Sequence, residues 1–352
     1  MERDIGLFDR PLLSFARPTP RRMAIVSAAA GLIILQSAVS DGGISFLLAA
    51  CACTGSCAAE LLFSFVRKQR IVNDLSALAS ALIFTTMLPN TINPAFAFFG
   101  AFFGIAVVKG SFGGLGSNWL NPALSGWLFV RFSWPHLYTA SLEGSTIEAA
   151  GEIGGIAPAG GVLIAAAQKA VDFFNGTILQ TFSAEIPAGF AGFLVNTSPG
   201  IIADRGVMAA IAASILISAS VHRFMLSAVF LIPYLFLVRA SGALGGGGVW
   251  QGDMFYCLLS GGTLTAAFFL IADTATGPKS LGGKICAVLM AALFSFIFRY
   301  LKGETYGVFF AVALVNILCP VIRNLESAYL YNRPIRQAEN SGGMIKRFGG
   351  SQ

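Results

Sequence analysis

Ten apolar segments follow one another along the chain, separated by polar or glycine-rich stretches. They cover roughly residues 23–39, 44–66, 75–88, 94–108, 116–132, 206–221, 224–238, 254–272, 283–299 and 305–322. A straight helix needs about 20 apolar residues to cross a bilayer, and several of these segments are shorter. Short segments are typical of membrane helices that are interrupted inside the bilayer. The pattern therefore predicts an all-α polytopic membrane protein with about ten transmembrane helices.

The interruptions occur at matching places in the two halves of the chain. The matching pairs, about 184, 193 and 195 residues apart, are Pro94 with Pro278, Lys109 with Lys302, and Asn121 with Asn316. In the last segment, Asn316 and Pro320 are expected to interrupt the helix. The pattern indicates a duplication of five spans, and an odd number of spans inverts the second copy relative to the first.

The composition supports a membrane environment. Of 352 residues, 55% are hydrophobic and 11% are charged, and the mean hydropathy is +0.73. Soluble domains carry about 25% charged residues. The net charge of +6 is therefore interpreted as a topology signal and not as a sign of nucleic-acid binding.

The basic residues predict the orientation. With ten spans and the N-terminus inside, 17 of the 23 Lys and Arg residues fall on the inner side, so both termini are expected in the cytoplasm. We divide the chain into a cytoplasmic segment (1–22), a first five-helix repeat (23–132), an outer-side loop (133–205), a second repeat (206–322) and a cytoplasmic tail (323–352).

The sequence indicates neither a metal site nor hydrolytic chemistry. Cys51, Cys53 and Cys57 share one apolar segment without His or acidic neighbours, which favours a packing role over metal binding. His136 and His222 lie in loops and suggest no catalytic pair.

Two acidic residues lie in or beside predicted spans, where an ionisable group is a functional hypothesis by default. Glu60 is expected to extend toward Arg67 at the inner membrane surface and not to carry protons. For Asp273, two roles stay open. It either caps the following helix through its carboxylate or takes part in function.

A glycine-rich turn, Gly113–Gly116, precedes two asparagines at the predicted start of a helix. Asn118 and Asn121 are three residues apart and would share one helical face. Such amides either pair with backbone groups freed by the interruption or present donors and acceptors to a planar polar ligand. The residues alone leave both roles open.

The stretch Gly113–Leu124, reading GGLGSNWLNPAL, resembles a segment of the D subunit of the Rnf complex and of the homologous B subunit of the sodium-pumping NADH:quinone reductase. The second half is similar too, in Leu259–Thr263, Ala272–Asp273 and Tyr306–Val308. The resemblance covers roughly residues 75–325 and therefore both repeats.

The resemblance implies a urea-transporter-like fold of two inverted five-helix repeats in a bacterial inner membrane. It implies a subunit, inactive as an isolated chain, whose partners are the other Rnf subunits and the bilayer. The complex would couple electron transfer between ferredoxin and NAD to translocation of Na+ or H+. Two flavins are implied, an FMN joined by a phosphoester to an outer-side threonine and a non-covalent riboflavin. Asn118, Asn121 and Asp273 would hold the riboflavin.

The family's attachment motif is matched best by Asp172–Thr177, reading DFFNGT, which assigns Thr177 as the FMN site with Asp172 beside it. The match lacks the alanine before the threonine, so a plain loop threonine stays open. Thr146 and the stretch 154–158 are weaker candidates. The rival function is a urea-like channel or permease without covalent flavin, and a third is a scaffold subunit that has lost it.

Overall fold

A computed structural model describes residues 19–40, 43–68, 75–111, 118–138, 168–169, 171–173, 175–177, 201–204, 206–219, 224–245, 254–271, 273, 276–278 and 280–348. These residues are almost entirely helical, and the one extended pairing among them is an isolated bridge between Pro89 and Ile201. The expected all-α class is confirmed for this part of the chain.

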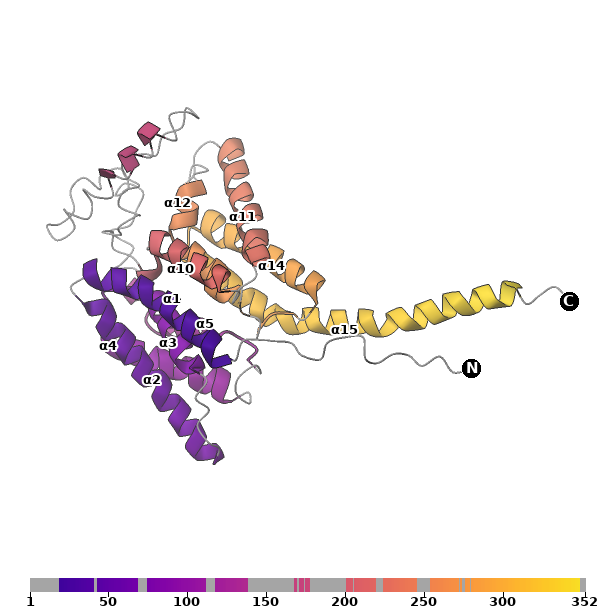
Figure 1. Ribbon diagram of the computed structural model, residues 1–352, viewed down its shortest axis with the longest axis horizontal. Coiled ribbons are helices and arrows are strands. Elements are labelled where there is room, and N and C mark those ends of the chain that lie inside the picture. The colour runs from indigo at the N-terminus through magenta and orange to yellow at the C-terminus, as the bar shows by residue number, and fades with distance from the viewer. Residues whose placement is uncertain are drawn as a thin grey trace.

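The first half consists of five helical elements (Figure 1, indigo to magenta). They are α1 (Thr19–Ser40), α2 (Ile44–Arg67), α3 (Ser76–Thr86), α4 (Pro94–Phe103) continued by the π-helical η1 (Gly104–Gly110), and α5 (Pro122–Ser133). A short 3₁₀ helix, η5 (Ile202–Asp204), follows the predicted outer-side loop.

The second half lies beside the first (Figure 1, rose to yellow). It consists of α10 (Gly206–Ser218), α11 (Phe224–Gly245), α12 (Met254–Leu259), α13 (Thr263–Thr265) with the π-helical η6 (Ala266–Leu270), α14 (Leu281–Phe296) with the π-helical η7 (Ile297–Leu301), and α15 (Gly307–Phe348). Both α4 and α14 thus end in a π-helical turn.

In the part of the chain that the structure describes, five helices are long and apolar enough to cross a membrane. These spans are Pro20–Val39, Ile44–Val66, Phe224–Gly242, Leu281–Leu301 and Gly307–Ser327. Shorter apolar helices cover Ser76–Thr86, Pro94–Gly110 and Met208–Ser218. The protein is therefore a multi-pass membrane protein by the length and composition of its helices.

The predicted interruptions are confirmed after α3 and after η6. The helices that follow them begin with side-chain caps. Asn93 accepts a hydrogen bond from the Ala95 amide (2.9 Å), and Ser280 accepts one from the Gly283 amide (3.0 Å). An oxygen acceptor at this position satisfies one of the backbone donors that a helix start leaves unpaired, so the caps fix where α4 and α14 begin.

Two details of the expected pattern are wrong. Asn316 and Pro320 do not interrupt a helix, because α15 continues through both without a break. The neighbouring helix α14 packs along α15, and tertiary packing of this kind can keep a proline-containing helix intact. Conversely, the segment 254–272 is broken at Ser260–Gly262, where Gly261 and Gly262 adopt positive φ values of 63° and 68°.

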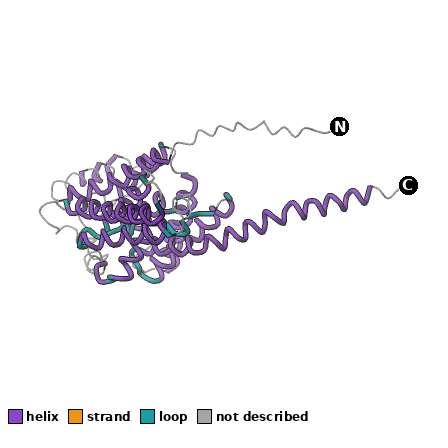
Figure 2. Tube along the Cα trace, turned by 90° about the horizontal axis from the view of Figure 1, so that it is seen from below, coloured by secondary structure: helices purple, strands orange, loops and turns teal. Residues whose placement is uncertain are grey.

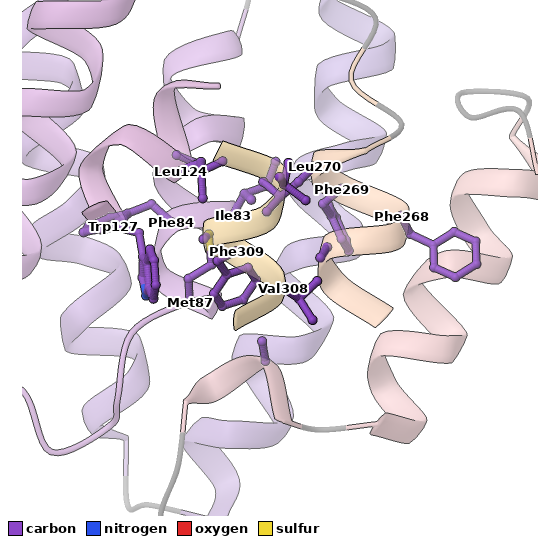
Figure 3. Packing of buried hydrophobic residues seen from close by; sticks show 14 of the residues in the cluster. Ile83, Phe84, Met87, Leu124, Trp127, Phe268, Phe269, Leu270, Val308 and Phe309 are labelled. Carbon is purple, nitrogen blue, oxygen red and sulfur yellow. The ribbon is translucent and has the colours of Figure 1, made fainter. Parts of the chain in front are cut away.

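Part of the largest hydrophobic core lies where the two halves meet (Figure 3). Side chains of α3 and α5 pack there against side chains of η6 and α15. The labelled members are Ile83, Phe84, Met87, Leu124, Trp127, Phe268, Phe269, Leu270, Val308 and Phe309. One continuous core therefore connects the interrupted helices of both halves.

An ion pair joins the end of α5 to the loop between η7 and α15. Arg131 lies 3.2 Å from Glu304, and its guanidinium group lies 5.3 Å from the centre of the Tyr138 ring. Burial raises the pKa of Tyr138, so this phenol stays protonated at neutral pH. The contact ties the end of the first half to the loop that precedes α15.

Candidate functional site

The interruption after η6 and the start of α5 meet through their polar side chains. Asn121 donates a hydrogen bond from Nδ2 to Oδ2 of Asp273 over 3.0 Å. The two residues are 152 positions apart, and each lies at an irregular stretch of backbone. The structure thus brings Asn121 and Asp273, predicted independently as site residues, into direct contact across the two halves.

Asn121 is the N-cap of α5. Its Oδ1 accepts hydrogen bonds from the amides of Ala123 (3.0 Å) and Leu124 (3.4 Å). The expectation that Asn118 and Asn121 share one helical face is wrong, since α5 begins only at Pro122. The alternative in which the amide pairs with freed backbone is confirmed for Asn121.

Asn118 has a different environment from Asn121. The residue is 6% exposed, and its Oδ1 has no hydrogen-bond partner among the described residues. A buried acceptor without a partner costs about 1–3 kcal/mol, and such groups usually mark a ligand, a water or an ion. Of the two asparagines, Asn118 is therefore the one with an oxygen atom available to accept a hydrogen bond from a ligand N–H group.

Asp273 does not cap the following helix. The N-cap of α14 is Ser280, seven residues further along the chain, so the capping role is excluded for the described geometry. Asp273 instead faces a cavity of about 40 Å³ that Thr276, Lys284 and Asn316 also line. Among the described residues, the cavity has room for a few water molecules.

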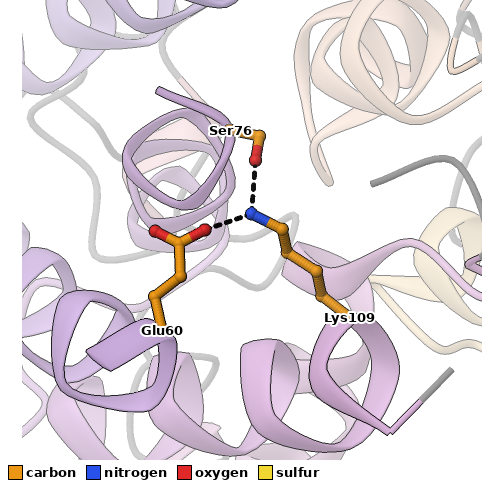
Figure 4. Close-up of polar contacts among 3 residues, drawn as sticks. All are labelled: Glu60, Ser76 and Lys109. Carbon is orange, nitrogen blue, oxygen red and sulfur yellow. Dashed lines mark hydrogen bonds and ion pairs between the residues drawn. The ribbon is translucent and has the colours of Figure 1, made fainter. Parts of the chain in front are cut away.

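Glu60 has a different partner from the one expected. Its carboxylate forms an ion pair with Lys109 in η1, and Lys109 also donates to Oγ of Ser76 over 2.6 Å (Figure 4). Lys109 is only 8% exposed. A buried charge needs an opposite charge and hydrogen bonds. The π-helical η1 places the Lys109 ammonium group next to α2. This buried ammonium group therefore attracts Glu60 more strongly than a solvated arginine would.

Arg299 in η7 is a buried cation that the sequence interpretation missed. It is 1% exposed and donates to Tyr234 Oη (2.9 Å), Thr263 Oγ1 (2.7 Å) and Ser260 Oγ (3.0 Å). The signal in the sequence is an arginine inside an apolar run, which is costly in a membrane unless the residue is functional or paired. In the topology prediction, Arg299 is counted only as one of the basic residues on the outer side.

The two buried cations occupy comparable places. Lys109 and Arg299 each lie in the π-helical turn that ends an apolar helix. Each bonds a hydroxyl at the first residue of a helix, Ser76 of α3 or Thr263 of α13. This correspondence between the halves is not among the pairs that the sequence pattern indicates.

The candidate attachment residues lie on the surface. Asp172 and Thr177 are exposed and helical, and Asp172 accepts a hydrogen bond from Gln168 over 2.8 Å. The space beside Gly176 is open, since a Cβ there would meet nothing within 4 Å. The Thr177 hydroxyl is thus reachable for modification. The candidates Thr146 and 154–158 and the turn Gly113–Ser117 lie outside the described residues.

The described residues contain no group of three or more His, Cys, Asp or Glu side chains that could hold a metal ion. The polar groups near the start of α5 are the Asn118 oxygen, which has no partner among the described residues, and the amide of Asn121, which holds the carboxylate of Asp273. Such a set suits a neutral ring with adjacent N–H and C=O groups, as in the pyrimidine edge of a flavin.

Comparison with known proteins gives one family. The model of the NQR2, RnfD, RnfE family matches residues 8–331, which include every element from α1 to α14 and most of α15.

Similar proteins are the D subunits of ion-translocating complexes. The D subunit of the proton-translocating ferredoxin:NAD+ oxidoreductase complex of Clostridium ljungdahlii is 28% identical over 76% of this chain and 79% of the relative. The Na+-translocating counterpart of Acetobacterium woodii is 24% identical over 85% and 88%. The D subunit of the ion-translocating oxidoreductase complex of Methanosarcina acetivorans is 26% identical over 72% of each chain. The relatives thus include both coupling ions.

Proposed function

Because the chain belongs to the NQR2, RnfD, RnfE family, we propose that it is the flavin-bearing membrane subunit of an Rnf-type complex. It is a subunit of an ion-translocating oxidoreductase, and its partners are the other subunits of that complex. The complex would couple electron transfer between ferredoxin and NAD to translocation of Na+ or H+. The observation that carries the proposal is the family match over 8–331 together with the Asn121–Asp273 contact at the interruptions.

The proposed architecture has ten spans in two inverted five-helix repeats of the urea-transporter type. The comparable positions of Lys109 and Arg299 support it, as do the π-helical ends of α4 and α14. With both termini in the cytoplasm of a bacterial inner membrane, Thr177 would lie on the outer side.

Two flavins are proposed. An FMN would be joined by a phosphoester to Thr177, with Asp172 beside it, and a riboflavin would bind at Asn118, Asn121 and Asp273. A flavin accepts two electrons and releases them singly, which is chemistry that these side chains lack. Asn118 would accept a ring N–H group, and Asn121 would hold Asp273 in place while capping α5.

The attachment is tested by replacing Thr177 with valine, which has nearly the same shape but lacks the hydroxyl. The fluorescent flavin band of the denatured polypeptide on a gel should disappear in Thr177→Val, while the protein stays in the membrane fraction. Thr146→Val is the matched control and should keep the fluorescence.

A fluorescent Thr177→Val band would move the ester to another hydroxyl. A wild-type band without fluorescence would favour the channel or scaffold function over a covalent flavoprotein.

A further inference from the structure

Four irregular stretches of backbone meet at one place between the halves. The amide of Ile202 donates to the carbonyl of Leu88 (2.9 Å), in the interruption after α3. The amide of Gly262, in the break between α12 and α13, donates to Oδ1 of Asp204 (2.9 Å). A Cβ on Gly261 would collide with the carbonyl of Thr305, just before α15. The end of the predicted outer-side loop therefore joins a cluster that contains all of these irregular stretches.

The turn between α12 and α13 lies between two charged groups. Arg299 bonds the hydroxyl groups of Ser260 and Thr263, which flank the turn, while Asp204 accepts the Gly262 amide. Asp204 also lies close enough to Arg299 to interact with it electrostatically. Arg299 thus bonds oxygen atoms of the turn, and Asp204 accepts an N–H group of the same turn. The buried guanidinium and the half-buried carboxylate are therefore compensated through the same few residues.

Both glycines of the turn are required by this arrangement. A Cβ on Gly261 would lie 2.7 Å from Nη2 of Arg299, and one on Gly262 would lie 3.2 Å from Cδ1 of Ile201 and closer still to Phe309. Their positive φ values are also unfavourable for other residues. Glycine is therefore the residue that this turn requires at both positions.

We propose that Arg299, the turn Ser260–Thr263 and Asp204 form a clamp that holds the end of the outer-side loop against both halves. Asp204 is its positioning residue. Through residues 201–204 it fixes the point at which the outer-side loop, which carries Thr177, rejoins the membrane domain, and so it limits where a covalent flavin on that loop can sit. The role in flavin placement rests on the proposed function, whereas the clamp itself does not.

The test replaces Asp204 with asparagine, which keeps an oxygen acceptor for the Gly262 amide but removes the charge. A cysteine introduced at Ala203, a 3% exposed neighbour, reports opening of the clamp through its reaction with a maleimide. In the full complex, labelling should become about tenfold faster in Asp204→Asn, as expected for losing one charge-assisted hydrogen bond. Quenching of the native flavin fluorescence by iodide should also increase, while the covalent flavin content stays unchanged.

Two variants serve as controls. Lys302→Gln removes a charge at an exposed position just after η7, away from the clamp and the attachment motif, and should alter neither readout. Asp204→Glu keeps the charge and should label at a rate between wild type and Asp204→Asn, which separates loss of charge from misfolding.

Unchanged labelling in Asp204→Asn would overturn the clamp. Faster labelling with unchanged iodide quenching would confirm the clamp but overturn its role in placing the flavin. A wild-type protein without covalent flavin would refute the proposed function, and maleimide labelling would still decide whether Asp204 holds the loop.

Discussion

Asn118 and Asn121 are the same residue type, three positions apart, yet their hydrogen bonds give them different tasks. Asn121 uses its oxygen to cap α5 and its nitrogen to hold Asp273. Asn118 buries an oxygen atom that has no partner among the described residues. Removing Asn121 would therefore damage the helix start as well as any ligand site, and Asn118 is the better residue with which to test flavin binding.

We expect Asn118→Leu to lose most of the releasable riboflavin while thermal stability stays equal to that of the wild type or rises. The unpaired acceptor costs about 1–3 kcal/mol without a ligand, and one lost hydrogen bond weakens binding about tenfold. Acid extraction followed by chromatography would give riboflavin per subunit.

Asn316→Leu provides the matched control, since Asn316 is also buried and its Nδ2 has no partner in the described part of the chain. It lines the small cavity beside Asp273 and should retain riboflavin. Equal riboflavin in Asn118→Leu and wild type would leave Asn118 without a binding role.

At the scale of elements, α4 and α5 are held together by glycines. A Cβ on Gly104 would collide with the carbonyl of Pro122, and one on Gly126 would lie 2.5 Å from the carbonyl of Gly100. Gly100 and Gly104 are four residues apart and so lie on one face of the helix. Small residues at such an interface let two helix backbones approach closely within a membrane. The packing sets the position of α5 and hence of Asn121 at its start.

Gly104→Ala should therefore displace the start of α5 and separate Asn121 from Asp273. We expect a loss of releasable flavin together with a destabilisation of about 1–3 kcal/mol, the usual cost of overpacking. Flavin content and thermal unfolding would be measured on the same preparation.

Gly31→Ala, in α1, is the control for the loss of a helical glycine. A Cβ there would meet nothing within 4 Å, so this variant should be neutral or up to about 1 kcal/mol more stable. A Gly104→Ala protein with full flavin content would show that the site does not depend on the close packing of α4 and α5.

At the scale of the whole molecule, periodicity and hydropathy predicted the helical class and the interruptions after α3 and η6. Asn93, Ser280 and the prolines near them are local signals that a sequence displays directly. The continuity of α15 through Pro320 could not be predicted in this way, because it depends on the neighbouring α14. The Asn121–Asp273 contact depends on how two halves 152 residues apart pack together, and no local spacing contains that information.

The proposed topology makes a prediction for the intact protein. A reporter that is active only outside the cytoplasm should stay silent when fused after residue 352 and become active when inserted near Glu148. The excess of basic residues on one side of the predicted spans is the physical reason. The reverse pattern would place Thr177 in the cytoplasm and refute the outer-side flavin.

The helix α15 projects far from the rest of the molecule (Figures 1 and 2). Its 42 residues correspond to a rod of about 63 Å, of which the apolar span Gly307–Ser327 makes up about half. In a rod of this length, a tilt of about 5° at the base moves the far end by roughly 5 Å. Because the base at Gly307 packs directly against Arg299, a small shift at the clamp would be converted into a displacement large enough for a neighbouring protein of the complex to detect.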